Sequence, residues 1–157
     1  ACPAAKTKPQ PRPARIWPYD PDYEVRFRQK PPQPCYDLAK KHQAILYSRL
    51  VRNLNQMKGC LASGYPFVFG FSVYESFESQ EVANTGIVPM PSPNEQLLGG
   101  HAVLAIGYDD SQRRFIVRNS WGTGWGMQGY FTMPYAYLLD DNLADDFWTI
   151  RRVEDES

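Results

Sequence analysis

The sequence predicts an α+β fold in which an antiparallel β-sheet or open barrel carries one or two packed helices. Short apolar segments follow one another from residue 35 onward, separated by turn residues, which is typical of consecutive strands. Only residues 54–63 combine a capping residue with apolar positions spaced along one helical face. Many short strands with few helices between them favour an antiparallel sheet.

Proline dominates the first part of the chain, where residues 1–34 hold nine of the 14 prolines. In Lys6–Arg15 proline alternates with basic residues, and each proline pushes its predecessor toward extended geometry. We therefore expect residues 1–34 to be an extended basic arm. A linker or surface strap is the favoured role, and binding of an acidic partner or an SH3-like groove is the alternative.

The first globular segments alternate between helix and strand. Residues 36–43 form a short helix candidate, and residues 44–51 resemble a strand. Asn53 is placed to cap a helix over 54–63, in which Leu54, Met57, Cys60 and Leu61 recur at helical spacing. Gly64 then ends this helix.

The rest of the chain predicts strands joined by loops. Residues 66–73 form a strong candidate for a buried strand, the polar residues 76–85 hold a helical turn, and residues 89–100 read as a loop. Further strands are expected at residues 101–108, 113–119, 129–133 and 146–152, with a hairpin turn at 109–112. Residues 153–157 form an acidic tail.

Composition disfavours several classes of protein. Lys plus Arg and Asp plus Glu each number 17, so the basic field of a nucleic-acid binder is missing. No apolar run is long enough for a membrane helix. Two histidines and no C-x-x-C motif disfavour a metal site. Ala1 stands where a start methionine is expected, which indicates a processed form, an excised piece or a fragment.

A histidine and an asparagine flank the predicted hairpin. His101 opens an apolar strand directly after Gly99-Gly100, and Asn119 ends the neighbouring strand. Antiparallel pairing about the turn at 109–112 would bring the two side chains together. The asparagine oxygen would then accept from one ring N–H, leaving the other ring nitrogen for proton transfer. Trp121 would shield this hydrogen bond from water.

In this order the motifs resemble those of the papain-like cysteine peptidases. The second half of that family carries a histidine, an apolar strand ending in Gly-Tyr, then Asn-Ser-Trp-Gly, Trp-Gly and Gly-Tyr. The matching residues here are His101–Tyr108, Asn119–Gly122, Trp125-Gly126 and Gly129-Tyr130. The segment Tyr65–Phe71 looks like the strand that lines the family's substrate cleft. Trp17–Asp20 and Gly99–His101 look most like bacterial and archaeal members.

The resemblance implies a fold and a site. Residues 35–152 would be the β-rich domain of a papain-like C-terminal portion, cleaving peptide bonds with a Cys-His-Asn constellation. His101 would be the general base that pairs with a thiolate, Asn119 would orient it, and Trp121 would cover their contact. Gly70 and Ala102 would lie near the pocket for the substrate residue second from the cleaved bond. A peptide or protein substrate is implied, and no cofactor.

The family's nucleophile does not match any cysteine of the chain. A catalytic cysteine that precedes its histidine by about 130–150 residues would lie about 30–50 residues before Ala1. Cys2 sits beside Pro3 with no helix start after it to lower its pKa. Cys60 falls on the apolar face of a predicted helix and reads as a buried structural thiol. Cys35 and Cys60 fit either a disulfide or two free thiols.

Three hypotheses follow. The favoured one is the C-terminal part of a papain-like endopeptidase whose cysteine lies outside this chain, with the missing helical domain or a homodimer mate as partner. The second is a non-catalytic module that binds a peptide or protein. The third is a rearranged enzyme that uses Cys2. The first also implies that removing the helical domain exposes an apolar interface around Trp121, Trp125 and the 67–71 strand.

Overall fold

The computed structural model describes residues 29–153 and divides the chain into two compact units. One unit comprises residues 44–153, and the other comprises residues 1–43 and 154–157. Residues 1–28 of the predicted arm and 154–157 of the predicted tail lie outside the described residues, so both assignments stay predictions. Within the smaller unit, helix α1 spans Gln33–Ala39, with a proline in its first turn, where proline is well tolerated. It begins and ends earlier than the expected 36–43.

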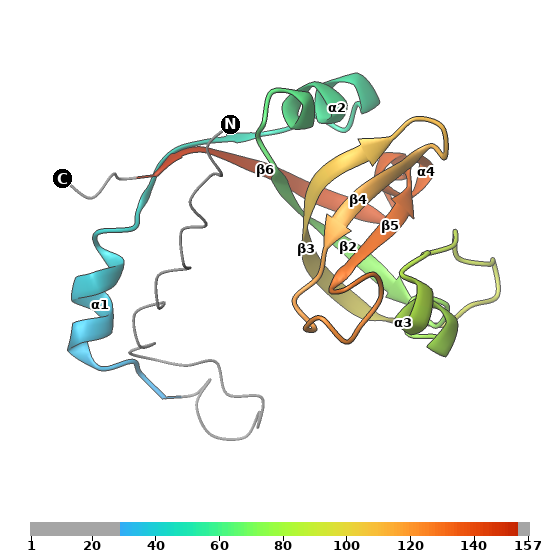
Figure 1. Cartoon of the computed structure of the whole chain (residues 1–157), viewed down its shortest axis with the longest axis horizontal. Coiled ribbons are helices and arrows are strands. Elements are labelled where there is room, and N and C mark those ends of the chain that lie inside the picture. Colours follow the sequence, from blue (N-terminus) through green and yellow to red (C-terminus); the bar gives the residue numbers. More distant parts are fainter. Residues whose placement is uncertain (1–28, 154–157) are drawn as a thin grey trace, which may run out of the picture. The chain divides into compact units, whose positions relative to one another are not determined.

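The larger unit contains an open, six-stranded antiparallel sheet with strand order β1-β6-β2-β3-β4-β5 (Figure 1). The strands are β1 (Ala44–Arg49), β2 (Phe67–Tyr74), β3 (Leu97–Asp109), β4 (Arg114–Arg118), β5 (Tyr130–Pro134) and β6 (Ala144–Val153). Three helices accompany them: α2 (Leu54–Ala62), α3 (Gln80–Thr85) and α4 (Tyr135–Leu139). The α+β prediction with an antiparallel sheet is confirmed, and the strand order places β1 and β5 at the two edges of the sheet.

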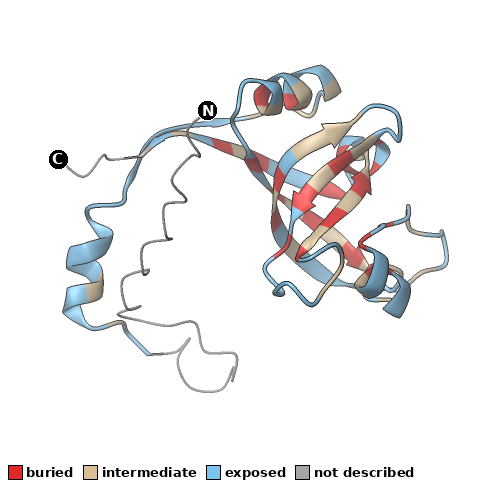
Figure 2. Cartoon of the chain, in the orientation of Figure 1, coloured by how far each residue is buried: buried red, intermediate tan, exposed pale blue. Residues whose placement is uncertain are grey.

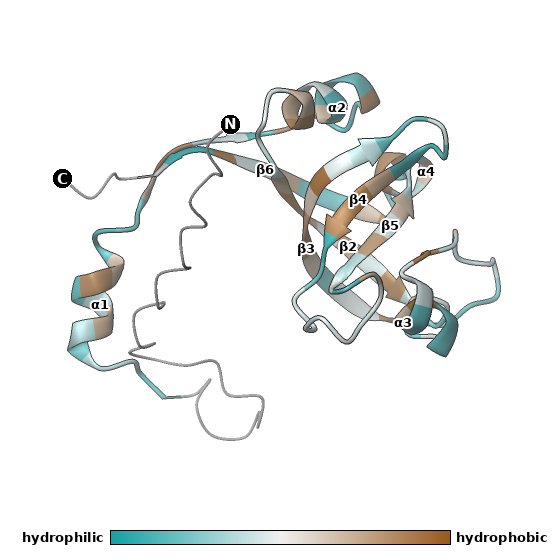
Figure 3. Ribbon diagram, viewed as in Figure 1, coloured by the Kyte–Doolittle hydropathy of each residue, from teal (hydrophilic) through white to brown (hydrophobic). Residues whose placement is uncertain are grey.

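The core lies on one face of the central strands. Every second residue of β2, from Phe67 through Phe69 and Phe71 to Val73, is buried (Figure 2). Burying each large apolar side chain stabilises the fold by about 1.5–3 kcal/mol. Strand β4 shows the same alternation of burial, and three consecutive apolar residues occupy its middle, whereas the turn that joins β3 to β4 is hydrophilic (Figure 3). The sheet is therefore built on the two-residue period that the sequence shows.

Helix α2 is fixed at both its start and its exposed side. The side chain of Asn53 accepts a hydrogen bond from the Gln56 N–H, which confirms the predicted N-cap. Lys58 Nζ then binds both carboxylate oxygens of Asp110, at 2.6 and 2.7 Å, in the β3–β4 turn. The hydrogen bond from Lys58, followed by that from Tyr135, lowers the pKa of Asp110. This carboxylate thus ties α2 and α4 to the hairpin that carries the candidate site.

Two differences from the sequence predictions have physical causes. Strand β3 begins at Leu97 rather than at residue 101, because Gly99 and Gly100 pair with Val73 and Ser72 of β2 in extended geometry. Helix α4 was not predicted, because its aromatic residues favour strands in isolation. Tyr135 and Tyr137 are buried in it. Within residues 29–153, no helix has both the length and the apolar character needed to cross a membrane.

Candidate functional site

His101 and Asn119 come together at the end of the β3–β4 pair. His101 lies on β3 opposite Phe71 of β2, and Asn119 directly follows Arg118, the last residue of β4. Antiparallel pairing about the 109–112 turn brings the two side chains into contact, with His101 Nε2 2.9 Å from Asn119 Oδ1. The structure thus has the His–Asn contact that the hairpin predicts.

A second hydrogen bond identifies which ring nitrogen carries the proton. The backbone N–H of Ser120 donates to the same Asn119 Oδ1 at 2.8 Å, so this atom is the amide oxygen. An oxygen accepts only, so the neutral His101 ring donates from Nε2 and keeps the lone pair on Nδ1. Asn119 is only 8% exposed, which shields both hydrogen bonds from water. The site therefore presents Nδ1 as the proton acceptor.

Aromatic rings enclose the His–Asn pair. The Trp121 ring stacks on the His101 ring, with centroids 5.1 Å apart and planes 21° apart. Phe77 meets Trp121 edge-on at 5.5 Å, and Phe71 meets the imidazole edge-on at 5.8 Å. Phe77 is buried, whereas Trp121 keeps 44% of its surface exposed. The imidazole is thus held between apolar rings, with one outer wall open to solvent.

The loop that carries Trp121 depends on glycine. The Asn119 N–H donates to the Gly129 carbonyl at 2.9 Å, which closes the segment into a loop. Gly126 has φ +57°, and a Cβ there would lie 2.5 Å from the Tyr130 carbonyl oxygen. No side chain fits that backbone without moving it. The glycine-rich sequence after Asn119 thus allows the fold that places Trp121 over His101.

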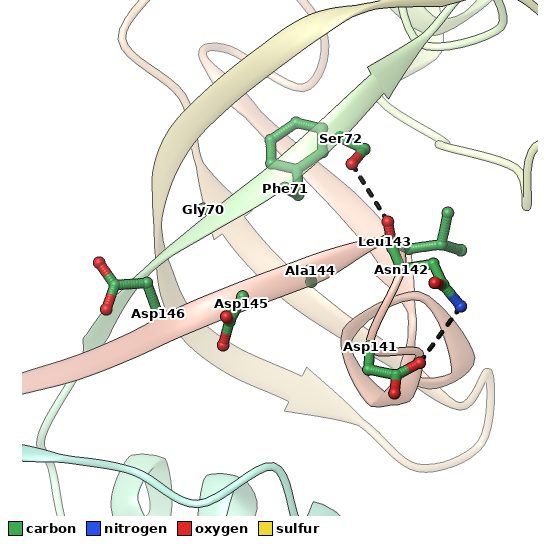
Figure 4. Close-up of a pocket in the computed structure, with 9 residues that line it drawn as sticks. All are labelled: Gly70, Phe71, Ser72, Asp141, Asn142, Leu143, Ala144, Asp145 and Asp146. Carbon is green, nitrogen blue, oxygen red and sulfur yellow. Dashed lines mark hydrogen bonds between the residues drawn. The ribbon is translucent and has the colours of Figure 1, made fainter.

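A pocket of about 250 Å³ lies between β2 and the chain segment that leads into β6 (Figure 4). Gly70 and Phe71 line one side, and Asp141, Asn142, Asp145 and Asp146 belong to the other. Ala102, the register partner of Gly70, is not one of its lining residues. Asp145 and Asp146 also pair with Arg49, at 3.7 and 3.8 Å, so part of the pocket's negative charge is neutralised.

Sequence comparison assigns the family. The papain family cysteine protease domain matches residues 17–139 of the chain. The chain belongs to the papain family of cysteine proteases. A peptidase C1-like protein of Acanthamoeba polyphaga mimivirus, itself uncharacterized, is 48% identical over 147 residues, covering 88% of this chain and 46% of that protein. Cathepsin L of Sarcophaga peregrina is 38% identical over 81 residues, covering 50% of this chain and 23% of that protein.

Structural comparison agrees with this assignment. Xylellain, a cysteine protease from Xylella fastidiosa, superposes with a TM-score of 0.74 at 48% sequence identity. The match covers 78% of this papain-family chain and 46% of xylellain. The chain therefore spans less than half the length of the viral relative and of xylellain. The resemblance to a papain-like C-terminal portion, and to bacterial members, is confirmed.

The two cysteines in the described part of this papain-family chain lie on helices. Cys60 is 5% exposed on α2, and its Sγ donates to the Tyr65 carbonyl at 3.3 Å, as expected for a buried thiol. Cys35 lies on α1, and both thiols are free in the structure. Cys2 lies outside the described residues. Among residues 29–153, no three His, Cys, Asp or Glu side chains are grouped to hold a metal ion.

One sequence expectation about exposed surface is wrong in part. Trp121 is exposed as expected, but Phe67, Phe69 and Phe71 are buried. Their side chains point to the core face of β2, because alternate residues of a strand face opposite sides. Phe77 was also not predicted from the sequence. It is a single large aromatic residue in the polar segment 76–85, and this was the one sign that the segment packs against the site.

Proposed function

We propose that this chain supplies the general base of a papain-like cysteine endopeptidase, with a nucleophilic cysteine from sequence outside residues 1–157. The observation that carries the proposal is the double acceptor role of Asn119 Oδ1, which binds Ser120 N–H and His101 Nε2. That arrangement fixes the ring orientation and leaves Nδ1 free. In a Cys-His-Asn constellation, this nitrogen takes the thiol proton.

The proposed chemistry has two steps. The thiolate attacks the scissile carbonyl carbon, and the imidazolium of His101 gives the proton from Nδ1 to the departing amine, leaving a thioester. A water molecule then loses a proton to Nδ1 as its oxygen attacks the thioester, and cleavage of the carbon–sulfur bond releases the acid and restores the thiolate–imidazolium pair. Through both steps Asn119 holds the ring in one plane, and Trp121 keeps water from their hydrogen bond.

We assign the pocket beside Gly70 to a substrate side chain. It opens next to Phe71, whose ring contacts His101, so a substrate held at the imidazole lies close to it. Glycine leaves space there that any larger residue would take up. Ala102 is exposed on the neighbouring strand, and we place it at the edge of the same substrate path.

The first test of the function is thiol-dependent hydrolysis. We expect the full gene product that contains this chain to cleave a fluorogenic peptide, and to lose the activity after alkylation with iodoacetamide. Residues 1–157 alone are expected to be inactive. Activity of residues 1–157 that disappears in Cys2→Ser would contradict the proposal and favour the rearranged enzyme. Peptide binding by the full gene product without any cleavage would favour the non-catalytic module.

The substrate pocket gives a separate prediction at Gly70. A Cβ at this position would lie 3.7 Å from the Asp145 carbonyl oxygen, which is an ordinary contact, so Gly70→Ala is expected to fold normally. The added methyl group narrows the pocket. We expect KM to rise for peptides with a large side chain at that subsite and to change little for peptides with alanine there. The ratio of the two KM values is expected to increase by about tenfold. Equal effects on KM for both peptides would mean that the pocket beside Gly70 does not bind a substrate side chain.

A further inference from the structure

Two glutamates join the end of β2 to the start of β3. The Glu95 carboxylate accepts the Ser76 N–H at 3.0 Å with one oxygen and the Ser92 N–H at 2.8 Å with the other. Glu75 completes the arrangement, because its carboxylate accepts the Gln96 N–H and its own N–H donates to the Gln96 carbonyl, both at 3.3 Å. We call these five residues, Glu75, Ser76, Ser92, Glu95 and Gln96, the glutamate clamp.

The clamp directly precedes two parts of the candidate site in the chain: Phe77 and the strand that carries His101. Phe77 follows Ser76 directly, and its ring contacts Trp121 at 5.5 Å and His101 at 6.5 Å. Gln96 directly precedes Leu97, the first residue of the strand that carries His101. Phe77 and His101 therefore each lie within a few residues C-terminal to a member of the clamp, on two segments that the clamp joins.

We infer that Glu95 is a positioning residue for His101: by fixing Ser76 and Ser92 it sets the position of Phe77, and through Phe77 the stacking of Trp121 on the imidazole. Its effect on catalysis rests on the proposed function, whereas its effect on the ring geometry does not. Within the described residues, the Glu95 carboxylate bonds Ser76 and Ser92 and makes no hydrogen bond to His101 or Asn119, so its role is indirect.

The clamp is built to stay charged. Hydrogen bonds from the side chain of Ser76 and from the backbone N–H groups of Ser92 and Ser76 lower the pKa of Glu95 from 4.5 to about 2. A lowered pKa means that the stabilising contribution is fully present above pH 4.5 and is lost as the pH falls through about 2. The carboxylate therefore holds both N–H groups throughout the pH range in which an imidazole base works.

The test compares Glu95→Gln with Glu78→Gln. The amide of Glu95→Gln keeps one accepting oxygen and replaces the other with a donor that faces an N–H, so one clamp bond is lost. Glu78 is exposed on the turn that also carries Ser76, and Glu78→Gln changes the net charge by the same amount as Glu95→Gln. In residues 1–157, NMR is expected to show faster exchange of the His101 Nε2 proton and a changed Trp121 ring environment for Glu95→Gln only.

Kinetics of the full gene product supply the second readout. We expect Glu95→Gln to lower kcat by about tenfold with KM within about twofold, because a misplaced base affects the chemical step. Glu75→Ala, which removes only the side-chain contact to the Gln96 N–H, is expected to give a smaller loss in the same direction. NMR spectra of Glu95→Gln identical to those of Glu78→Gln would overturn the inference. An NMR change in a protein without peptidase activity would overturn the proposed function alone.

Discussion

Replacing His101 with alanine is expected to abolish peptide hydrolysis by the full gene product, lowering kcat/KM by on the order of 10⁴. Asn119 orients the ring through Nε2, and Nδ1 is the proposed acceptor for the thiol proton. Without it, the nucleophile stays a neutral thiol and the leaving amine receives no proton. The measurement is the initial rate on a fluorogenic peptide across a range of substrate concentrations.

The chain offers a matched control for this substitution. His42 is the other of the chain's two histidines and lies on an exposed segment that belongs to the other compact unit. His42→Ala is expected to keep the activity within about twofold. A His101→Ala variant that folds and retains more than a tenth of the activity would show that another group acts as the base.

Replacing Asn119 with alanine is expected to lower kcat by about 10²-fold. The substitution removes the acceptor that the Ser120 N–H and His101 Nε2 share, so the ring can rotate and adopt the other tautomer. It also removes the acceptor of two partly buried hydrogen bonds, which costs about 1 kcal/mol of folding free energy. Rates should therefore be measured well below the melting temperature of the variant, as followed by circular dichroism.

Two further variants separate orientation from stability. Asn119→Asp keeps an oxygen that can accept both hydrogen bonds, so it is expected to recover part of kcat. Asn84→Ala removes an exposed asparagine on α3 that bonds only Gln80 among the described residues, and it is expected to leave kcat unchanged. A kcat for Asn119→Ala equal to that of Asn84→Ala would mean that Asn119 has no orienting role.

The pairing of His101 with Asn119 was predictable because it follows from local chain features. Polar turn residues at 109–112 fix an antiparallel hairpin, and the hairpin register then brings the two strand ends together. The alternation of buried residues in β2 and the Asn53 cap are local in the same way. These predictions needed only the two-residue period of strands and the hydrogen-bonding preference of a helix start.

The parts that sequence did not predict depend on contacts between distant segments. Phe77 reaches the imidazole only because the 75–79 turn folds back onto the loop after β4. Glu95 joins the glutamate clamp only because β3 begins at Leu97, which brings residue 95 beside Ser76. Gly70 lines a pocket because β6 inserts beside β2 in the sheet, and nothing in the local sequence fixes that strand order.

The most direct test of the account is the tautomer of His101 in residues 1–157, measured by ¹⁵N NMR of the neutral imidazole. The account predicts a protonated Nε2, with its proton protected from exchange by Asn119 Oδ1, and an unprotonated Nδ1. This protection should disappear in Asn119→Ala. A neutral ring protonated at Nδ1 in the unsubstituted chain would contradict the account, because the nitrogen proposed to take the thiol proton would already carry one.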